Sequence, residues 1–393
     1  MSGSWTARGW RAALTAVLFA YMAFALASGL DRISQTSVPL ARSVPVFFRA
    51  EANRTLAGDA LLRGDRTAAL AAARAALHAD PVDPTGGALL GAAYMLHGDA
   101  GRADAAFRVA AQFGWRVQLT QLYWYEAAMR AGDFDQAALR VDALMRVDPG
   151  MPEGAALIGG LEAAPAGRTA LARRLALGPG WTERYFQIAD GADPAILARK
   201  QDVALQLAKL GTRNCDVLFA LVEGLRRAGA HEAARTVWSA HCGDPGPKAG
   251  VADTQFVQLA RDDAKPAPFG WRFIRSGEIQ AGLVPEGKGA YRIQASNSGD
   301  IGLPLVAQPV AWPAGHYRLQ VDAQTQGELA LGRVFASLNC GDEPQRPVHL
   351  EGDVLDKGQI LEARDCADQV LALWLRPGED PVSIANVRVE KVD

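Results

Sequence analysis

The chain has 393 residues, of which 49% are hydrophobic, and its 41 lysines and arginines nearly balance its 43 aspartates and glutamates, for a formal net charge of −2. This balance provides no basic excess of the kind that nucleic-acid-binding proteins carry, so we expect no nucleic-acid partner. The length is sufficient for a membrane segment and two folded domains, each with a core of its own.

An uncharged apolar run, AALTAVLFAYMAFALASG, covers residues 12–29. Its length is near the lower limit for a helix that spans a bilayer. Arg8 and Arg11 precede it, which predicts a cytoplasmic N-terminus. Residues 1–30 are therefore interpreted as a single-pass anchor in the inner (cytoplasmic) membrane, with the bulk of the chain periplasmic. A cleaved signal is the alternative, because Ala25-Leu26-Ala27 is an acceptable cleavage site that would release a secreted or periplasmic protein.

A repeat follows residues 31–48, which are predicted to be a linker. Gly64-Asp65, Gly98-Asp99 and Gly132-Asp133 recur at one constant interval, and an alanine lies five positions after each glycine. Glycine adopts a positive φ at a helix end without strain, and aspartate is a suitable N-cap for the next helix. Alanine lets the two helices touch. We therefore expect three helix pairs over residues 49–152.

The middle repeat also matches a known consensus. The interval between successive Gly-Asp dipeptides equals the period of the tetratricopeptide repeat, which is about 34 residues. The matching residues are Leu90, Gly91, Tyr94, Gly98, Ala103, Phe107 and Ala110. The segment resembles a tetratricopeptide domain in which Trp115 replaces the usual closing proline. The resemblance implies an α-solenoid with a concave groove that binds protein segments.

Early positions of each first helix are expected to face that groove. This expectation makes Gln121 and Tyr123 candidate partner-binding residues. Tyr125 is a third candidate, because Tyr123 and Tyr125 flank Trp124, which falls at a helix-packing position. Packing between helices is the alternative interpretation for the aromatic side chains.

Residues 153–242 keep a helical spacing of apolar residues but lose the consensus, which predicts degenerate helical repeats. Cys215 and Cys242 mark the ends of one such helix pair, and these ends meet in an antiparallel hairpin. An even number of cysteines in an exported chain favours disulfides. We predict a Cys215–Cys242 bridge and a Cys340–Cys366 bridge; a metal site that uses the first pair is disfavoured, because no Cys-x-x-Cys is present.

The composition changes at GDPGPKAG, which opens a predicted linker at residues 243–268. Beyond it, short runs of alternating apolar residues separated by Gly, Pro and Asn predict a β-sandwich over residues 269–393. The segments QPVAWPAGHYRLQVDA and SIANVRVEKV resemble strands of jelly-roll carbohydrate-binding modules. The resemblance implies that Trp271 and Trp312 stack on sugar rings; burial in the core is the alternative for both.

The sequence contains no Gly-x-Ser-x-Gly, phosphate-binding loop, His-Glu-x-x-His or calcium loop. We therefore expect no enzymatic activity, no cofactor and no metal. The expected fold class is multidomain, α then β: an α-solenoid of tetratricopeptide helix pairs followed by a jelly-roll-like β-sandwich.

The organisation resembles exported bacterial tetratricopeptide proteins, some of which accompany exopolysaccharide machinery. The resemblance implies a non-enzymatic scaffold or adaptor, held at the membrane by its N-terminal helix, that binds partner proteins at the cell envelope. The alternative is a glycan-binding accessory factor of envelope polysaccharide machinery that acts through the sandwich.

Overall fold

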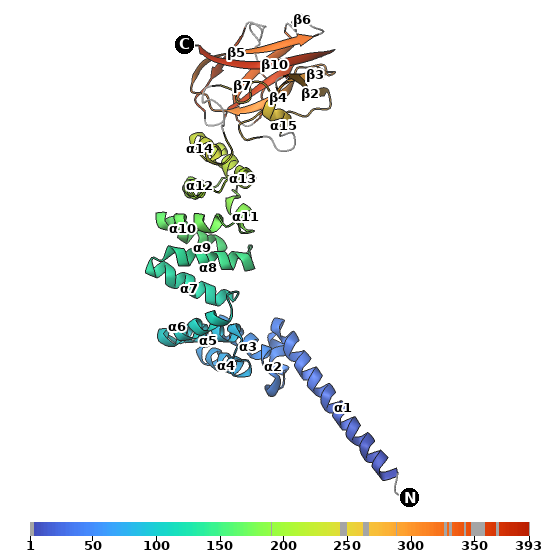
Figure 1. Ribbon diagram of the computed structural model, residues 1–393, viewed down its shortest axis with the longest axis vertical. Helices are drawn as coiled ribbons and strands as arrows, with labels where there is room; N and C mark the ends of the chain where they lie inside the picture. Colours follow the sequence, from blue (N-terminus) through green and yellow to red (C-terminus); the bar gives the residue numbers. More distant parts are fainter. Residues whose placement is uncertain are drawn as a thin grey trace. The chain divides into compact units, whose positions relative to one another are not determined.

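A computed structural model describes residues 4–189, 191–243, 250–261, 267–287, 289–325, 328–329, 332–341, 343–346, 358–366 and 369–392. Within these residues, the helices come first in the chain and the strands follow (Figure 1). The chain divides into two compact units, Met1–Arg174 and Leu175–Asp393.

The first unit begins with a long apolar helix, α1 (Ser4–Ile33). Among the described residues, it is the one helix that is long and apolar enough to cross a membrane, and its most apolar window is not buried by the rest of the chain. A single membrane span and a signal sequence both have these properties. The helix becomes partly buried only at its C-terminal end, where Asp31 is 6% exposed.

The segment predicted as a linker, residues 31–48, is folded. It contains η1 (Ser34–Thr36), α2 (Val38–Ser43) and η2 (Val46–Phe48). Ala41 and Val44 are fully buried against Ala52 of the following helix. Such short turns have no apolar periodicity, which is why the sequence pattern did not reveal them.

Three helix pairs follow at the predicted period. They are α3 (Glu51–Leu62) with α4 (Arg66–Ala79), α5 (Pro84–His97) with α6 (Ala100–Phe113), and α7 (Gln118–Ala131) with α8 (Phe134–Val147). The glycine of each Gly-Asp dipeptide has a positive φ, which is 84° at Gly98. The Asp99 carboxylate accepts a hydrogen bond from the Arg102 N–H at 3.0 Å. Asp65 and Asp133 cap α4 and α8 in the same way. The alanine that lies five positions after each of the three glycines is fully buried. The predicted roles of these glycines, aspartates and alanines are confirmed.

Helices continue beyond the three pairs over residues 153–242, as the apolar spacing predicted, and one short helix lies in the segment predicted as a linker. They are α9 (Gly154–Ala163), α10 (Pro165–Leu175), α11 (Thr182–Phe186), α12 (Pro194–Lys209), α13 (Cys215–Arg227), α14 (His231–His241) and α15 (Val257–Arg261). A disulfide joins Cys215, at the start of α13, to Cys242, which directly follows α14, with a Cα–Cα distance of 5.2 Å. This pairing is the one predicted.

The described strands of the second unit form two antiparallel sheets. Their bounds are β1 (Arg272–Phe273), β2 (Ile279–Gly287), β3 (Ala290–Asn297), β4 (Leu303–Val310), β5 (Gly315–Thr325), β6 (Glu328–Leu329), β7 (Val334–Cys340), β8 (Gln359–Ala363), β9 (Gln369–Leu375) and β10 (Gly378–Val392). One sheet has the order β1-β4-β9-β7, and the other has the order β2-β3-β10-β5-β6, with β8 also paired to β5.

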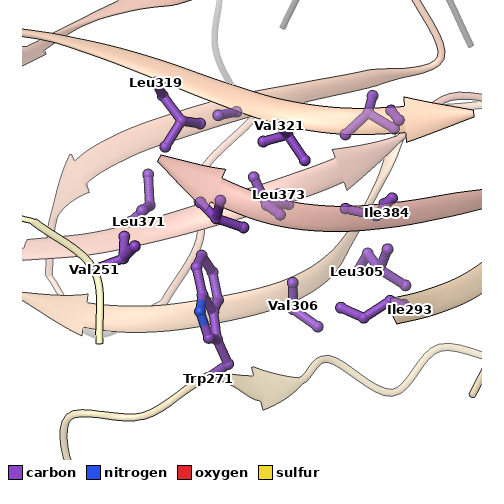
Figure 2. Close-up of a cluster of buried hydrophobic side chains, with 14 of the residues drawn as sticks. Val251, Trp271, Ile293, Leu305, Val306, Leu319, Val321, Leu371, Leu373 and Ile384 are labelled. Atoms are coloured by element: carbon purple, nitrogen blue, oxygen red, sulfur yellow. The ribbon is translucent and has the colours of Figure 1, made fainter. Parts of the chain in front are cut away.

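The two sheets share one apolar core (Figure 2). Leu305 and Leu371 come from one sheet, and Ile293, Leu319 and Ile384 come from the other. The alternation along β5 places Tyr317, Leu319 and Val321 inside, as the period of two predicted.

The core extends into the segment predicted as the linker at residues 243–268. Val251, Phe256 and Leu259 are buried in the cluster that the two sheets share. The Tyr291 N–H donates to the Gln255 carbonyl at 3.0 Å, which holds this segment on β3. The described residues 250–261, which include the short helix α15, therefore belong to the β-region rather than to a linker.

Candidate functional site

The predicted partner-binding residue Gln121 is buried, with 1% of its surface exposed. Its side-chain amide donates to the Trp115 carbonyl at 2.6 Å, and its amide oxygen accepts from Arg140 at 3.3 Å. Val117, the N-cap of α7, contributes no side-chain hydrogen bond. Gln121 therefore fixes the α6–α7 turn, where Trp115 takes the place of proline, and it does not line an open groove.

Tyr125 is also buried, at 4% exposure, and its hydroxyl donates to the Leu157 carbonyl of α9 at 2.7 Å. Burial raises the pKa of this phenol to about 12, and the charge of Glu126 adds to the rise. Its position beside Trp124 predicted a groove residue. The side chain instead connects α7 to α9.

Tyr123 is half-buried and stacks on Phe107, with ring centroids 4.2 Å apart. Its hydroxyl donates to Asp104 at 3.1 Å. Burial raises the pKa of Tyr123, and the hydrogen bond to Asp104 acts in the same direction. Tyr123 thus joins α7 to α6, so the packing alternative describes both tyrosines better than the groove does.

An apolar cavity lies elsewhere in the same repeats, among α4, α5, α6 and the α4–α5 turn. Its volume is about 340 Å³. The lining residues are Leu77, Pro81, Asp83, Gly87, Leu90, Tyr94, Arg102, Ala105, Ala106, Val109, Ala110 and Phe113. Small side chains on facing helices leave the space open. Val109 and Phe113 at its edge are about half exposed, at 50% and 53%.

Arg102 lines the cavity beside Tyr94, and Arg74, which is not part of the lining, also contacts Tyr94. The guanidinium groups of Arg74 and Arg102 each lie 5.8 Å from the centroid of the Tyr94 ring. Arg74 also donates to the Tyr94 hydroxyl at 3.3 Å. The Asp99 carboxylate, 3.5 Å from Arg102, already caps α6 through its other oxygen. The arrangement combines an apolar lining with Arg102 and with Arg74 at the adjoining Tyr94, which suits an apolar group that carries a negative charge beside it.

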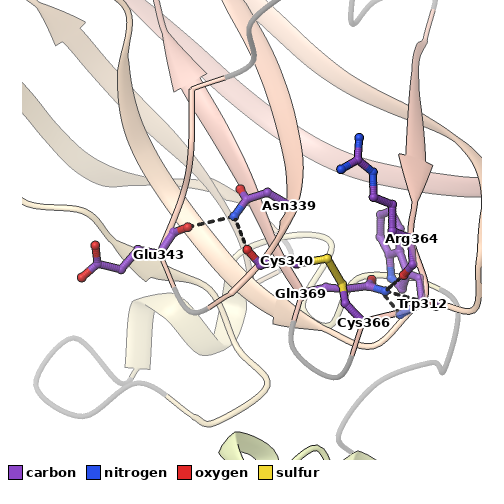
Figure 3. The surroundings of a disulfide bond; sticks show 7 residues. All are labelled: Trp312, Asn339, Cys340, Glu343, Arg364, Cys366 and Gln369. Carbon is purple, nitrogen blue, oxygen red and sulfur yellow. Dashed lines mark hydrogen bonds between the residues drawn. A yellow bond between two sulfur atoms is a disulfide. The ribbon is translucent and has the colours of Figure 1, made fainter.

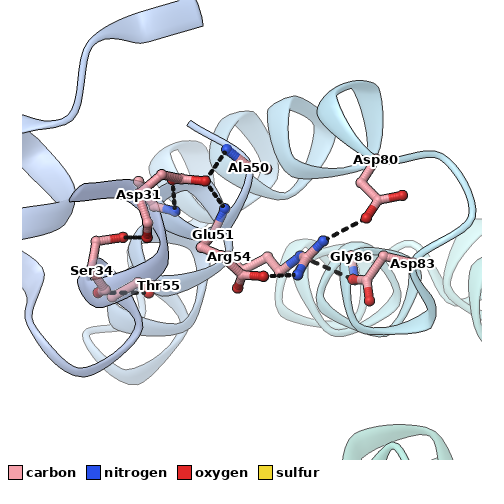
Figure 4. A network of polar contacts seen from close by, with 10 residues as sticks. Asp31, Ser34, Ala50, Glu51, Arg54, Thr55, Asp80, Asp83 and Gly86 are labelled. Atoms are coloured by element: carbon pink, nitrogen blue, oxygen red, sulfur yellow. Dashed lines mark hydrogen bonds and ion pairs between the residues drawn. The ribbon is translucent and has the colours of Figure 1, made fainter. Parts of the chain in front are cut away.

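The α4–α5 turn that forms part of the cavity wall is held in place by Arg54 of α3 (Figure 4). The Arg54 guanidinium lies 2.5 Å from Glu51, 2.9 Å from Asp80 and 3.0 Å from Asp83. Asp83 in turn accepts from the Gly86 N–H at 2.7 Å as the N-cap of α5. One partly buried cation thus fixes the turn and the start of α5, so the cavity is preformed.

The two predicted glycan-binding tryptophans are buried in the β-region. Trp271 is 1% exposed, and its ring lies 6.0 Å from that of Phe256. Trp312 is 2% exposed, and its indole N–H donates to the Gly250 carbonyl at 2.8 Å. Neither indole presents a face on which a sugar ring can stack. The burial alternative is therefore correct for both residues.

The surroundings of Trp312 also contain the second disulfide (Figure 3). Cys340 is joined to Cys366, as predicted, with a Cα–Cα distance of 6.0 Å. Gln369, three residues after Cys366, accepts from the Trp312 N–H at 3.1 Å and donates to the carbonyls of Trp312 and Arg364 at 2.9 Å. The bridge holds Cys366 beside the end of β7, and the buried amide of Gln369 holds the start of β9 beside Trp312.

Over the described parts of the chain, no three His, Cys, Asp or Glu side chains gather as metal ligands. No protein-family model and no curated protein sequence matches the chain. The cavity was not predicted from the sequence. The sequence feature that could have indicated it is the presence of small residues, Gly87, Ala105 and Ala106, on two helices that face each other.

Proposed function

We propose that the protein is a non-enzymatic adaptor, anchored in the membrane by α1, whose tetratricopeptide-like helix pairs bind a segment of a partner protein at the cell envelope. The regular succession of helix pairs supports a binding scaffold. The apolar helix α1 and the two disulfides are consistent with a location outside the cytoplasm.

The cavity among α4, α5 and α6 is the observation that carries this proposal. Its volume of about 340 Å³ is suited to large apolar side chains of a peptide. The arginines beside Tyr94 favour an acidic residue next to that apolar anchor. The partner segment that we propose therefore has an aromatic or aliphatic residue followed or preceded by Asp or Glu.

This assignment moves the binding site away from the predicted groove residues. Gln121, Tyr123 and Tyr125 support the packing of α6, α7 and α9, so they contribute indirectly. The two candidate residues of the glycan-binding alternative, Trp271 and Trp312, are buried in the core, so we do not propose that alternative.

The structure offers a matched pair of variants to test the site. Ala105 and Ala71 are exposed alanines at equivalent positions of successive repeats, and of the two only Ala105 lines the cavity. We expect Ala105→Trp to fill the cavity without disturbing the fold and Ala71→Trp to leave the cavity open. A photo-crosslinking amino acid at Val109, on the cavity edge, reports the occupant in intact cells.

The expected result is a protein adduct at Val109 that forms in the Ala71→Trp background and disappears in the Ala105→Trp background. Mass spectrometry of the adduct identifies the crosslinked segment, which should contain an apolar residue beside a carboxylate. An unchanged adduct in the Ala105→Trp protein, or a segment without such residues, would contradict the proposal.

A further inference from the structure

A pair of apolar side chains projects from the loop between α1 and α3. Val46 and Phe47 of η2 are 72% and 98% exposed, so Phe47 has almost no contact with the described chain. Full exposure of a phenylalanine in an otherwise packed segment is unfavourable in water, because its apolar area stays hydrated. The same segment contributes Val44 to a buried cluster, so the exposure is confined to the tip of the loop.

The position of η2 beside α1 indicates what covers this tip. Phe48 contacts Phe24 of α1, with ring centroids 5.2 Å apart in an edge-to-face arrangement. Leu30 of α1 also packs on the cluster that Phe48 joins. Phe24 lies five residues inside the apolar run that ends at Gly29, which is about 7.5 Å along the helix axis. If α1 spans the bilayer, η2 therefore lies at the depth where the hydrocarbon meets the headgroups.

The backbone of the loop is suited to that depth. Arg49 donates to the Val44 carbonyl at 2.6 Å and to the Arg42 carbonyl at 2.9 Å. The carbonyls of Pro45 and Val46 accept from the backbone of Phe48 and Arg49. A segment that leaves water must satisfy its polar groups internally. These bonds satisfy the carbonyls of Arg42, Val44, Pro45 and Val46.

The connection between α1 and the repeats is fixed as well. The Asp31 carboxylate, at the end of α1, accepts from the N–H groups of Ala50, Glu51 and Ala52 at 3.2, 3.0 and 2.9 Å (Figure 4). A carboxylate at the N-terminus of α3 also interacts favourably with the helix dipole. The loop thus cannot swing freely about α1. The guanidinium of Arg42 lies on the same segment. It is 3.7 Å from the Asp59 carboxylate, and 64% of the Arg42 side chain stays exposed, so it can also contact an anionic headgroup.

We propose that the η2 tip is a second membrane contact: Val46 and Phe47 insert into the leaflet from which α1 emerges, and Arg42 contacts its anionic lipids. The occupant of this surface is lipid. The contact rests on the proposed retention of α1 as an anchor. It sets the first helix pairs at a fixed angle to the bilayer, because Asp31 and Phe48 join α1 rigidly to α3.

Cysteine-directed fluorescence in vesicles tests this contact. The described cysteines are all paired in disulfides, so a polarity-sensitive label attaches only to an introduced thiol. We would label Phe47→Cys, Leu18→Cys and Leu62→Cys in the full chain, reconstituted in vesicles of phosphatidylcholine and phosphatidylglycerol with brominated acyl chains. Leu18 lies within the apolar run of α1. Leu62, 91% exposed at the end of α3, is the matched apolar control outside it.

The label at position 47 should emit at shorter wavelength than the label at position 62, and brominated lipid should quench most of its intensity while sparing position 62. Quenching at position 18 without quenching at position 47 would overturn the η2 contact alone and leave the anchor intact. A blue-shifted label at position 47 that brominated lipid does not quench would show a protein partner there, which also overturns the proposal. Absence of quenching at both positions 18 and 47 would overturn the anchor and the η2 contact together.

Discussion

The ring of Phe107 fills the space that a side chain at Gly91 would need. A Cβ at position 91 would lie 2.7 Å from two ring carbons of Phe107, which is closer than carbon atoms approach each other in proteins. Phe107 is 2% exposed, and Tyr123 stacks on it with ring centroids 4.2 Å apart. The glycine at this point of the repeat therefore permits the contact between α5 and α6.

Replacing Gly91 with alanine should destabilise the first unit by about 1–3 kcal/mol, because the Phe107 ring is held from several sides and has little room to move. Chemical denaturation of the full chain would show this as a lower midpoint. Gly58→Ala in α3 is the control. A Cβ at position 58 meets nothing within 4 Å, so this change should be neutral or stabilise α3 by about 0.5–1 kcal/mol. Equal effects of the two changes would contradict this account.

The buried hydroxyl of Tyr125 gives a second prediction. Tyr125→Phe removes its hydrogen bond and leaves the Leu157 carbonyl without that donor, so we expect a loss of about 1–3 kcal/mol in the free energy of unfolding. Tyr94→Phe removes a hydroxyl that accepts from Arg74 in an exposed location, and its effect should be smaller. Thermal unfolding of both variants provides the comparison, and a larger loss for Tyr94→Phe would contradict the prediction.

The sequence predicted those parts of the fold in which one residue type has one local role. Gly98 adopts a positive φ and Asp99 caps α6 because these properties depend on the backbone of a few residues. Segregation of the cysteines into two local pairs was likewise enough to predict both disulfides. These features need no knowledge of the tertiary neighbours.

The candidate site was harder to predict, because exposure depends on what packs against a side chain. Tyr125 flanks Trp124, which was expected to pack between helices, yet Tyr125 is covered by α9, which provides the Leu157 carbonyl. Trp312 belongs to a strand-like segment, but it is buried, and the Gly250 carbonyl accepts its indole N–H. The repeat period also gives no information on a gap between helices, so the cavity beside Ala105 and Val109 was not predicted.

The second disulfide should stabilise the β-region. The Cys340–Cys366 bridge closes a loop of 26 residues, and the chain-entropy model assigns such a bridge about 3 kcal/mol. The double variant Cys340→Ser/Cys366→Ser should therefore unfold at lower temperature while keeping its β-sheet circular dichroism at 25 °C, because β7 and β9 remain hydrogen-bonded. Addition of a reductant should bring the midpoint of the wild-type β-region transition close to that of the variant. A variant that melts at the wild-type temperature would contradict the prediction.

Acid should destabilise the second unit through His241. This side chain is 5% exposed, and its Nε2 lies 2.9 Å from the Ala204 carbonyl, which implies that Nε2 carries the proton in the neutral ring. Nδ1 is buried and has no hydrogen-bond partner among the described residues. Burial lowers the pKa of His241 below its ordinary value of 6.5, and Arg213 acts in the same direction, while the hydrogen bond to Ala204 partly opposes the shift.

The sign of the effect follows from proton binding. Between the lowered folded pKa and 6.5, the unfolded chain binds a proton at His241 that the folded chain does not, so the free energy of unfolding falls as the pH is lowered. The contribution of His241 is complete above pH 6.5 and declines below it, by at most about 1.4 kcal/mol for each pH unit. His241→Gln keeps a donor for the Ala204 carbonyl but does not titrate. Its stability should therefore decline less than that of the wild type between pH 7 and pH 5, whereas the exposed His78→Gln should match the wild type. Urea denaturation at a series of pH values measures this difference. The contributions of the carboxylates are common to all three proteins and cancel in the comparison. Parallel curves of unfolding free energy against pH for His241→Gln and the wild type would show that the burial of His241 does not control the acid sensitivity.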